Sequence, residues 1–179
     1  MRGLLILDAG PLFSLAAGGL LHTLLDFRVG ITDVVKEETM DRGLGIKPSV
    51  EAKALLSFYK KHRKTIEIFQ TQVGTDMRAA KAVNARFKAP PNLGELSIQS
   101  LLIRLQLLRN EPVPVVVFED GWFLRNAPGL PKPHVLISTQ AFLVNLQHLG
   151  KIKSASKARE DIAARRAKAY SAEMKIDAG

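Results

Sequence analysis

The sequence predicts an α/β protein in which a central, mostly parallel sheet is flanked by helices as an α/β/α sandwich. Short apolar segments alternate along the chain with longer segments of helical periodicity, and this alternation is typical of β-α-β units. Two of the apolar segments, Leu4–Leu7 and Val113–Phe118, lack the polar alternation of a half-exposed strand, which indicates strands covered on both faces. The length of 179 residues suits one domain with an appendage.

The other strands are shorter and are recognised by their β-branched residues; they are expected at Val29–Thr32, Thr65–Phe69 and Val135–Ile137. The helices are recognised by apolar residues three or four positions apart. Pro11 suits the first turn of the first helix, and Asp33 can cap the helix that follows the second strand. Further helices are expected over residues 20–27, 49–62, 75–87, 92–108 and 141–149, with a loop over residues 126–133.

The composition is that of a globular protein, but the charge is strongly positive. The chain has 26 Lys and Arg against 17 Asp and Glu, which gives a net charge of +9 and an isoelectric point near 10.0. This excess favours a polyanionic partner, and we favour nucleic acid over a membrane surface or a merely solvated basic surface. The chain has no cysteine, which excludes disulfides and fits a reducing cytoplasm. Neither a signal peptide nor a membrane span is expected, because no long uncharged apolar stretch occurs and the apolar N-terminal segment is interrupted by Asp8 and Pro11.

The chain is expected to divide into an α/β domain over residues 1–150 and a basic helical extension over residues 151–179. The extension has eight Lys and Arg and four Asp and Glu, so it carries +4 of the +9. Its apolar stripe is narrow, formed by Ala155, Ala158 and Ile162, which predicts a helix on the surface. Either a contact to nucleic acid or a solvated helix without function would account for it.

Two aspartates stand where the two buried strands end. Asp8 and Asp120 each follow an apolar run, and ligands of parallel sheets bind outside the carboxyl ends of the strands. If the strands are neighbours, about 4.8 Å apart, the two carboxylates can share one ion. Each has an ordinary alternative, Asp8 as a helix cap and Asp120 as a turn residue before Gly121. Glu119 competes with Asp120, but alternation along the strand favours Asp120.

Glu38 is set apart from its neighbour by helical periodicity. It continues the apolar face of Val34 and Val35, and an acid on such a face is costly unless it is paired or binds a metal ion. Glu37 is expected to be the solvated member of the pair. The alternative for Glu38 is an ion pair with Arg42, one helical turn away.

Glu95 lies at the start of the most apolar helix. It follows Asn92 by three residues, as the acid of a capping box does. Ile98 and Leu102 follow it at helical spacing, which places Glu95 on the inward face. A capping glutamate has less reason to face inward, so a ligand role competes with the capping role.

These stretches, in this order, resemble the PIN domain over roughly residues 2–149. The segments that carry the resemblance are LLILDAGPL around Asp8, ITDVVKEET with Glu38, NLGELSIQSLL with Glu95, VVVFEDGWFLRNA with Asp120, and HVLISTQAFLVNL near the end. Two features differ from the family. Glu-Asp-Gly-Trp stands where members often carry a second Asp or an Asn before the fourth acid, and the basic extension exceeds the compact toxin form.

The resemblance implies a metal-dependent endoribonuclease, often the toxin of a toxin–antitoxin pair, commonly dimeric and inhibited by a small partner protein. It implies that the four acids bind Mg²⁺ or Mn²⁺ and that Ser138 or Thr139 joins the site. The residues themselves agree, because four carboxylates in one crevice repel each other unless cations are bound, and these hard cations prefer oxygen ligands. The basic residues that could contact the RNA backbone are Lys81, Arg86, Lys88 and Arg125.

Two other functions compete with the nuclease. A non-catalytic RNA- or protein-binding module that keeps the fold would bind without turnover, although a mere binder does not need the four acids. Aspartyl-phosphate chemistry at Asp8 is disfavoured, since such hydrolases generally carry Asp-x-Asp and the second position here is Gly10. A P-loop is excluded because the chain has no GxxxxGK[ST] segment.

Overall fold

The computed structural model describes residues 3–41, 49–84, 86–108 and 111–166. Five strands form one sheet in the order β3-β2-β1-β4-β5, and every neighbouring pair is parallel. The strands are β1 (Leu4–Leu7), β2 (Arg28–Thr32), β3 (Ile66–Phe69), β4 (Val115–Phe118) and β5 (Val135–Ser138). The predicted α/β class and parallel sheet are confirmed, and each expected strand forms within two residues of its expected bounds.

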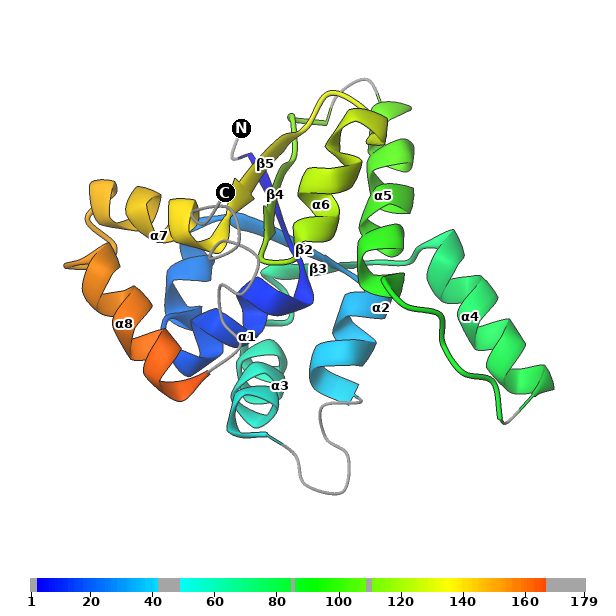
Figure 1. Cartoon of the computed structure of the whole chain (residues 1–179), viewed down its shortest axis with the longest axis horizontal. Coiled ribbons are helices and arrows are strands. Elements are labelled where there is room, and N and C mark those ends of the chain that lie inside the picture. The colour runs from blue at the N-terminus through cyan, green and yellow to red at the C-terminus, as the bar shows by residue number, and fades with distance from the viewer. Residues whose placement is uncertain (1–2, 42–48, 85, 109–110, 167–179) are drawn as a thin grey trace.

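The helices connect the strands and flank the sheet (Figure 1). The α-helices are α1 (Ala9–Ala17), α2 (Asp33–Lys36), α3 (Val50–His62), α4 (Gln72–Val83), α5 (Leu93–Gln106), α6 (Gly121–Asn126), α7 (Thr139–His148) and α8 (Ala155–Arg165). Shorter 3₁₀ segments, η1 (Leu21–Asp26) and η4 (Ala127–Gly129), and a π-helix, η2 (Glu37–Asp41), complete them. Within the described ranges, no helix is both long and apolar enough to cross a membrane.

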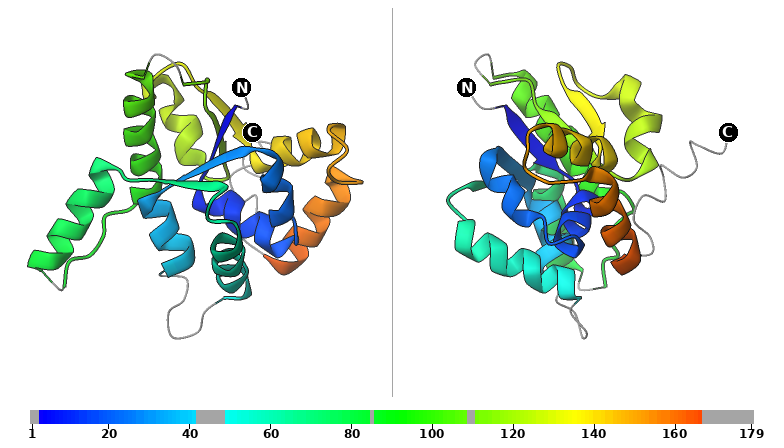
Figure 2. Two further views of the ribbon diagram at one scale, coloured as in Figure 1. Left: turned by 180° about the vertical axis from the view of Figure 1, so that it is seen from behind. Right: turned by 90° about the vertical axis from the view of Figure 1, so that its left-hand side faces the viewer.

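The direction of the connections changes at β1. The chain passes from β1 through α1 to β2 on one side, and it later returns from β3 through α4 and α5 to β4 on the other side of β1. Right-handed crossovers in opposite directions place α1 and α5 on opposite faces of the sheet, and the two helices lie on opposite sides of β1 in both views (Figures 1 and 2). The carboxyl ends of β1 and β4 therefore form a topological switch point, where a crevice opens.

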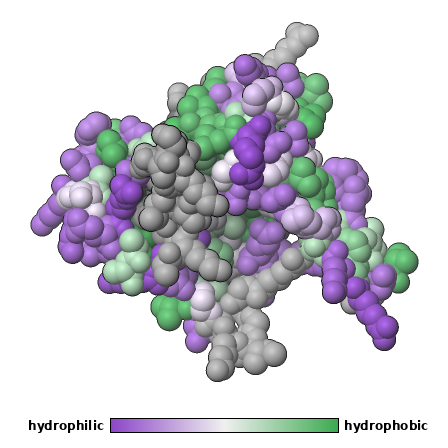
Figure 3. Space-filling model, in the orientation of Figure 1, coloured by the Kyte–Doolittle hydropathy of each residue, from purple (hydrophilic) through white to green (hydrophobic). Residues whose placement is uncertain are grey.

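The apolar runs identified in the sequence form the core. All four residues of β1 are buried, and the inward face of α5 packs in the same cluster through Ile98, Leu101, Leu102 and Leu105. The surface over α7 and α8 is mostly hydrophilic, in contrast to this interior (Figure 3). The core fixes the positions at which the strands end and thereby the positions of the acids that follow them.

The described part of the C-terminal extension packs against the domain through its narrow apolar stripe. Helix α8 contacts α1 and α7, and Ile162 is fully buried in the main core. A Cβ atom added at Gly18 would lie 2.9 Å from Cγ1 of Ile162, so the absence of a side chain at this position allows α8 to approach. Arg165 adds a hydrogen bond from its guanidinium to the carbonyl oxygen of Ala17 (2.7 Å). The predicted helix thus forms, and its apolar stripe is its buried face.

Several helix boundaries differ from the predictions because side-chain caps act there. Thr32, and not Asp33, caps α2, since its hydroxyl accepts a hydrogen bond from the Val35 N–H (3.1 Å). Helix α4 begins at Gln72, earlier than the expected residue 75, because Thr71 caps it by accepting from the Gly74 N–H (3.1 Å). Helix α6 was not predicted; six residues are too few to show a helical period.

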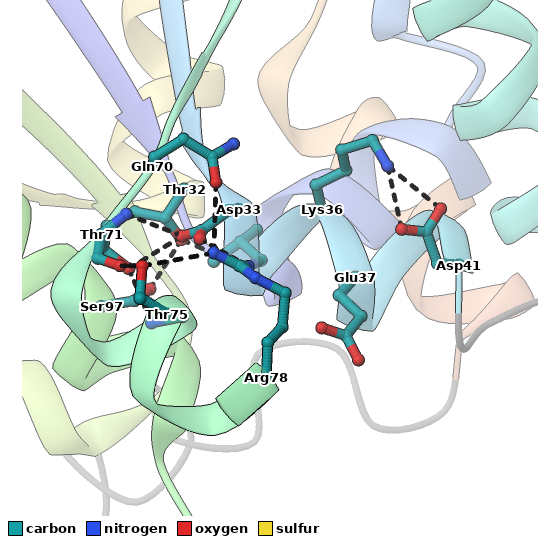
Figure 4. Close-up of polar contacts among 12 residues, drawn as sticks. Thr32, Asp33, Lys36, Glu37, Asp41, Gln70, Thr71, Thr75, Arg78 and Ser97 are labelled. Atoms are coloured by element: carbon teal, nitrogen blue, oxygen red, sulfur yellow. Dashed lines mark hydrogen bonds and ion pairs between the residues drawn. The ribbon is translucent and has the colours of Figure 1, made fainter. Parts of the chain in front are cut away.

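Asp33 has a structural role instead of a capping role. Its carboxylate accepts hydrogen bonds from the N–H and the hydroxyl of Thr71 (3.2 and 2.8 Å) and from the Arg78 guanidinium (2.8 Å), as Figure 4 shows. The side chain is 4% exposed. A Cβ atom added at Gly74 would lie 2.1 Å from Oδ2 of Asp33. Asp33 therefore joins α2 to the segment between β3 and α4, and a glycine is required beside it.

Replacing Asp33 with alanine is expected to lower the free energy of unfolding by about 3 kcal/mol, because the buried N–H and hydroxyl of Thr71 and the half-exposed guanidinium of Arg78 lose their acceptor. The matched control is Asp41→Ala, which removes an exposed carboxylate paired with Lys36 (2.9 Å, 50% exposed). That change is expected to cost less than about 1 kcal/mol. Urea unfolding of both variants measures the difference, and equal effects would show that the Asp33 contacts do not stabilise the fold.

Candidate functional site

An open pocket of about 270 Å³ lies at the carboxyl ends of β1 and β4. It is lined by residues from distant parts of the chain, namely Asp8, Ala9, Gly10, Glu38, Glu95, Glu119, Asp120 and Arg166. All four acids singled out in the sequence line this one pocket, together with a fifth acid and one cationic side chain. The acids that follow the two buried strands come together because β1 and β4 are direct neighbours in the sheet.

Asp8 occupies the centre of this arrangement. Its backbone N–H donates to the carbonyl oxygen of Val117 (3.1 Å), which continues the β1–β4 ladder by one residue. It stands at the N-cap position of α1, but its side chain makes no capping hydrogen bond. Desolvation, followed by the negative charges of Glu95, Glu38 and Asp120, raises the pKa of Asp8 to about 8, although a hydrogen bond from the Ala9 N–H acts against them. The ordinary alternative of a helix cap is therefore not realised.

Glu38 reaches the pocket through an irregular helix. Val34 and Val35 are fully buried on α2, and the helix then widens into the π-helix η2, which contains Glu38. π-Helical turns are rare and often occur at functional sites. Glu37 lies outside the pocket lining and forms an ion pair with Lys81. Periodicity therefore selected the acid that lines the pocket; the proposed alternative partner, Arg42, lies outside the described residues.

Glu95 lines the pocket from the first turn of α5 and is half-buried. Burial and the charge of Asp120 raise its pKa, while its own backbone N–H acts in the opposite direction. The capping box is not completed, because Asn92 adopts a left-handed conformation (φ 60°) and its side chain makes no capping hydrogen bond. The inward position predicted from Ile98 and Leu102 thus describes this residue better than the capping role.

Gly94 allows the carboxylates to gather at the start of α5. A Cβ atom at this position would lie 2.9 Å from Oε2 of Glu38 and 3.5 Å from Oδ1 of Asp8. These two distances place the carboxylates of β1 and η2 against the same helical turn that carries Glu95. A side chain at Gly94 would occupy the space between them. A residue without a side chain is therefore required at Gly94 for steric reasons.

Glu119 and Asp120 line the same pocket in different ways. Asp120 caps α6 by accepting a hydrogen bond from the Trp122 N–H (2.7 Å), and its side chain is 55% exposed. Its charge also raises the pKa of both Asp8 and Glu95. Glu119 is buried and accepts a hydrogen bond from Arg166 at Oε2 (2.6 Å). Asp120 thus faces the other acids, whereas Glu119 faces the cation.

Arg166 is the pocket residue that sequence reasoning did not single out. Its Nη1 donates to the carbonyl oxygen of Gly10 (3.0 Å), to Oγ of Ser14 (2.5 Å) and to Glu119, and its guanidinium lies 5.8 Å from the ring centroid of Phe13. It is separated from Gly10 by 156 positions in the chain. The only local signal was the positive charge of the extension, and this signal does not distinguish Arg166 from the neighbouring cations.

Ser138 and Thr139, expected near the site, do not line the pocket. The Ser138 hydroxyl caps α7 by accepting from the Ala141 N–H (3.2 Å), and the buried Thr139 hydroxyl donates to the carbonyl oxygen of Phe118 (3.4 Å). Both side chains are therefore engaged in fixing the start of α7 at the end of β5.

The basic residues expected to contact RNA do not line the pocket. Lys81 pairs with Glu37, while Arg86 and Lys88 are exposed after the end of α4. Arg125 is 71% exposed, and its Nη2 lies 3.9 Å from Oδ1 of Asp120. Of these four residues, Arg125 has a direct ion pair with an acid of the pocket.

The donor set of the pocket fits a hard divalent cation bound partly through water. The acids offer only oxygen atoms, and Oε1 of Glu119 is buried without a hydrogen-bond partner among the described residues. No three histidine or acidic side chains in the described ranges already stand in a geometry that encloses a metal ion. Mg²⁺ usually keeps several of its waters and is held by one or two carboxylates, so carboxylates spaced around an open pocket suit it.

The chain was compared with protein-family models, with curated proteins and with solved structures, and it matches none of them. The structure itself establishes an α/β fold with a five-stranded, all-parallel sheet and an acidic pocket at the carboxyl ends of its central strands.

Proposed function

We propose that the chain is a metal-dependent endoribonuclease of the PIN-domain kind that hydrolyses RNA phosphodiester bonds with Mg²⁺ or Mn²⁺. The observation that carries the proposal is the meeting of Asp8, Glu38, Glu95 and Asp120 in one pocket at the switch point of the sheet. Isolated buried acids have many structural uses, but four from separate elements share few uses other than binding cations. The resemblance of the sequence to PIN domains supports the same chemistry.

Each acid has a distinct structural support for this role. Asp8 is fixed by the β1–β4 ladder, and Glu38 and Glu95 approach from η2 and α5 around Gly94. Asp120 is oriented by its hydrogen bond from α6. Bound divalent cations would make a coordinated water more acidic and compensate the charge of the phosphate. The protein's own contribution is to hold four carboxylates where their mutual repulsion disappears once a cation is bound.

The substrate class is proposed from charge and from the resemblance. The net charge of +9 favours a nucleic acid strand, and exposed Arg125 stands at the edge of the acidic pocket. The resemblance adds the choice of RNA, a cytoplasmic toxin role with a small antitoxin protein, and a homodimer. These further proposals rest on the resemblance.

The direct test is cleavage of a fluorescently labelled single-stranded RNA by the purified full chain. Cleavage is expected with Mn²⁺ or Mg²⁺. It is expected to stop when EDTA is added, because the proposed mechanism depends on the cation that the carboxylates bind. Gel electrophoresis of the products over time measures the rate. Undiminished cleavage in excess EDTA would exclude the proposed mechanism.

A non-catalytic binding module is the second candidate. It is favoured by the finding that no three acids in the described ranges already enclose an ion. Such a module would bind RNA with an affinity that falls linearly with salt concentration on logarithmic axes, and it would leave the RNA intact with Mn²⁺ present. The cleavage assay therefore separates the two candidates in one experiment.

A further inference from the structure

Arg166 lines the acidic pocket, and several contacts hold its guanidinium in place. Nη1 donates to the carbonyl oxygen of Gly10 and to the hydroxyl oxygen of Ser14, both in α1, and to the carboxylate of Glu119. The guanidinium also packs on the ring of Phe13, and the side chain is 24% exposed. These contacts fix the position of the guanidinium before any ligand arrives.

Among the described residues, the anchoring of Arg166 uses one nitrogen of the guanidinium. All the hydrogen bonds that Arg166 makes with described residues come from Nη1. Nη2 and Nε are the pair of donors that can hold two oxygens of one phosphate side by side. A guanidinium held in place through Nη1 is therefore able to bind an anion through Nη2 and Nε.

The docking of α8 does not by itself explain this position. Ile162 is fully buried against α1, and Arg165 already donates a hydrogen bond to the carbonyl oxygen of Ala17. Arg165 anchors the end of α8 outside the pocket, whereas Arg166 turns into it. Arg165 and Arg166 thus carry the same charge, but Arg165 lies outside the pocket and Arg166 lines it.

An RNA phosphate needs a positive group in this pocket. The lining contains five carboxylates, from Asp8, Glu38, Glu95, Glu119 and Asp120, and the cation of Arg166. Divalent cations would balance the acids that they touch, but a phosphate also gains from a fixed donor beside the cations. Arg166 is the cationic side chain that the described residues place in the lining.

We propose that Arg166 binds a phosphate of the RNA strand in this pocket, with Glu119 and Ser14 as positioning residues that orient its guanidinium. The inference rests on the proposed nuclease function and adds a phosphate-binding residue to it. The C-terminal helix would then complete the substrate site, because it delivers Arg166 to the ends of β1 and β4. The group that Arg166 would bind is a phosphodiester next to the carboxylates.

The test compares Arg166→Ala, Arg166→Lys and Arg165→Ala in the full chain. Fluorescence anisotropy with a labelled single-stranded RNA in Ca²⁺ gives the affinity, and assays with Mn²⁺ give KM and kcat. Arg166→Ala is expected to weaken RNA binding by about tenfold or more, since a charge-assisted contact is lost. Arg166→Lys is expected to recover part of the loss, because it keeps the charge but not the bidentate geometry. Arg165→Ala, with the same change in net charge, should alter the affinity by less than about threefold.

Mn²⁺ affinity, measured by calorimetric titration, separates this role from others. Arg166→Ala should bind Mn²⁺ equally or more tightly, because a positive charge has left the pocket. Equal losses of RNA affinity in the Arg165 and Arg166 variants would overturn the inference, as would a gain in cleavage, which would mean that Arg166 blocks the site. If the wild type binds RNA but does not cleave it, the proposed nuclease fails while the affinity comparison still decides on Arg166. If cleavage requires metal but Arg166→Ala binds RNA normally, only the inference on Arg166 fails.

Discussion

Replacing Asp8 with asparagine is expected to reduce metal-dependent RNA cleavage by about a thousandfold. The change removes a carboxylate ligand of the proposed cation, and the cation stabilises the charge that develops at the phosphate by several kcal/mol. The fold should persist, since asparagine has the same shape and the β1–β4 hydrogen bond uses only the backbone of Asp8. Cleavage of labelled RNA with Mn²⁺ measures the loss, and circular dichroism monitors the fold. The metal-free variant should also be more stable than the wild type at pH 8, because an acid buried among like charges has been neutralised.

The matched control for this variant is Asp41→Asn. Asp41 is exposed, pairs with Lys36 and does not line the pocket, so its replacement should leave cleavage unchanged. Cleavage at the wild-type rate by the Asp8 variant would show that the pocket is not where RNA is hydrolysed. A variant that unfolds would point to a structural role for this carboxylate instead.

The second large effect is the response of the metal-free protein to pH. Asp8 has an ordinary pKa of 3.8 that rises to about 8 in the folded chain, through desolvation first and then the charges of Glu95, Glu38 and Asp120. The folded state therefore binds a proton more tightly than the unfolded state does. This contribution to stability is complete below about pH 4 and is lost as the pH rises toward 8. The free energy of unfolding should fall over this interval by up to about 6 kcal/mol.

Urea unfolding at several pH values in EDTA measures this dependence. The Asp8→Asn variant should lack most of it, because its amide does not titrate. Adding Mn²⁺ at pH 8 should restore the stability of the wild type, since a bound cation stabilises the folded state alone, and should affect the variant much less. A wild-type stability that is unchanged between pH 5 and pH 8 would mean that neither burial nor the neighbouring acids raise the pKa of Asp8 in the folded chain.

Much of the fold followed from local patterns in the sequence. The uninterrupted apolar run of β1 predicted a strand buried on both faces, and the alternation of strand and helix predicted the parallel sheet. The acids at the ends of β1 and β4 could be placed on one edge because parallel strands end on the same side of a sheet. Helical periodicity likewise chose Glu38 over Glu37 for the pocket. In each case a repeating local geometry connects sequence spacing with direction in space.

Other features depended on contacts between distant segments. Asp33 looked like a cap, but its partners Thr71 and Arg78 lie 38 and 45 positions away. Glu119 differs from Asp120 because it accepts a hydrogen bond from Arg166, 47 positions away, whereas Asp120 caps the adjoining helix α6.

The sequence alone determined the strands, most of the helices and the four acids, because these follow from backbone hydrogen bonding and from the burial of apolar side chains at short range. The tertiary structure decided that α8 packs against α1 and α7 and that Arg166 enters the pocket beside Glu119. The physical reason is that local periodicity fixes the direction of a side chain relative to its own element. Which charge meets which partner is decided only when the elements pack together.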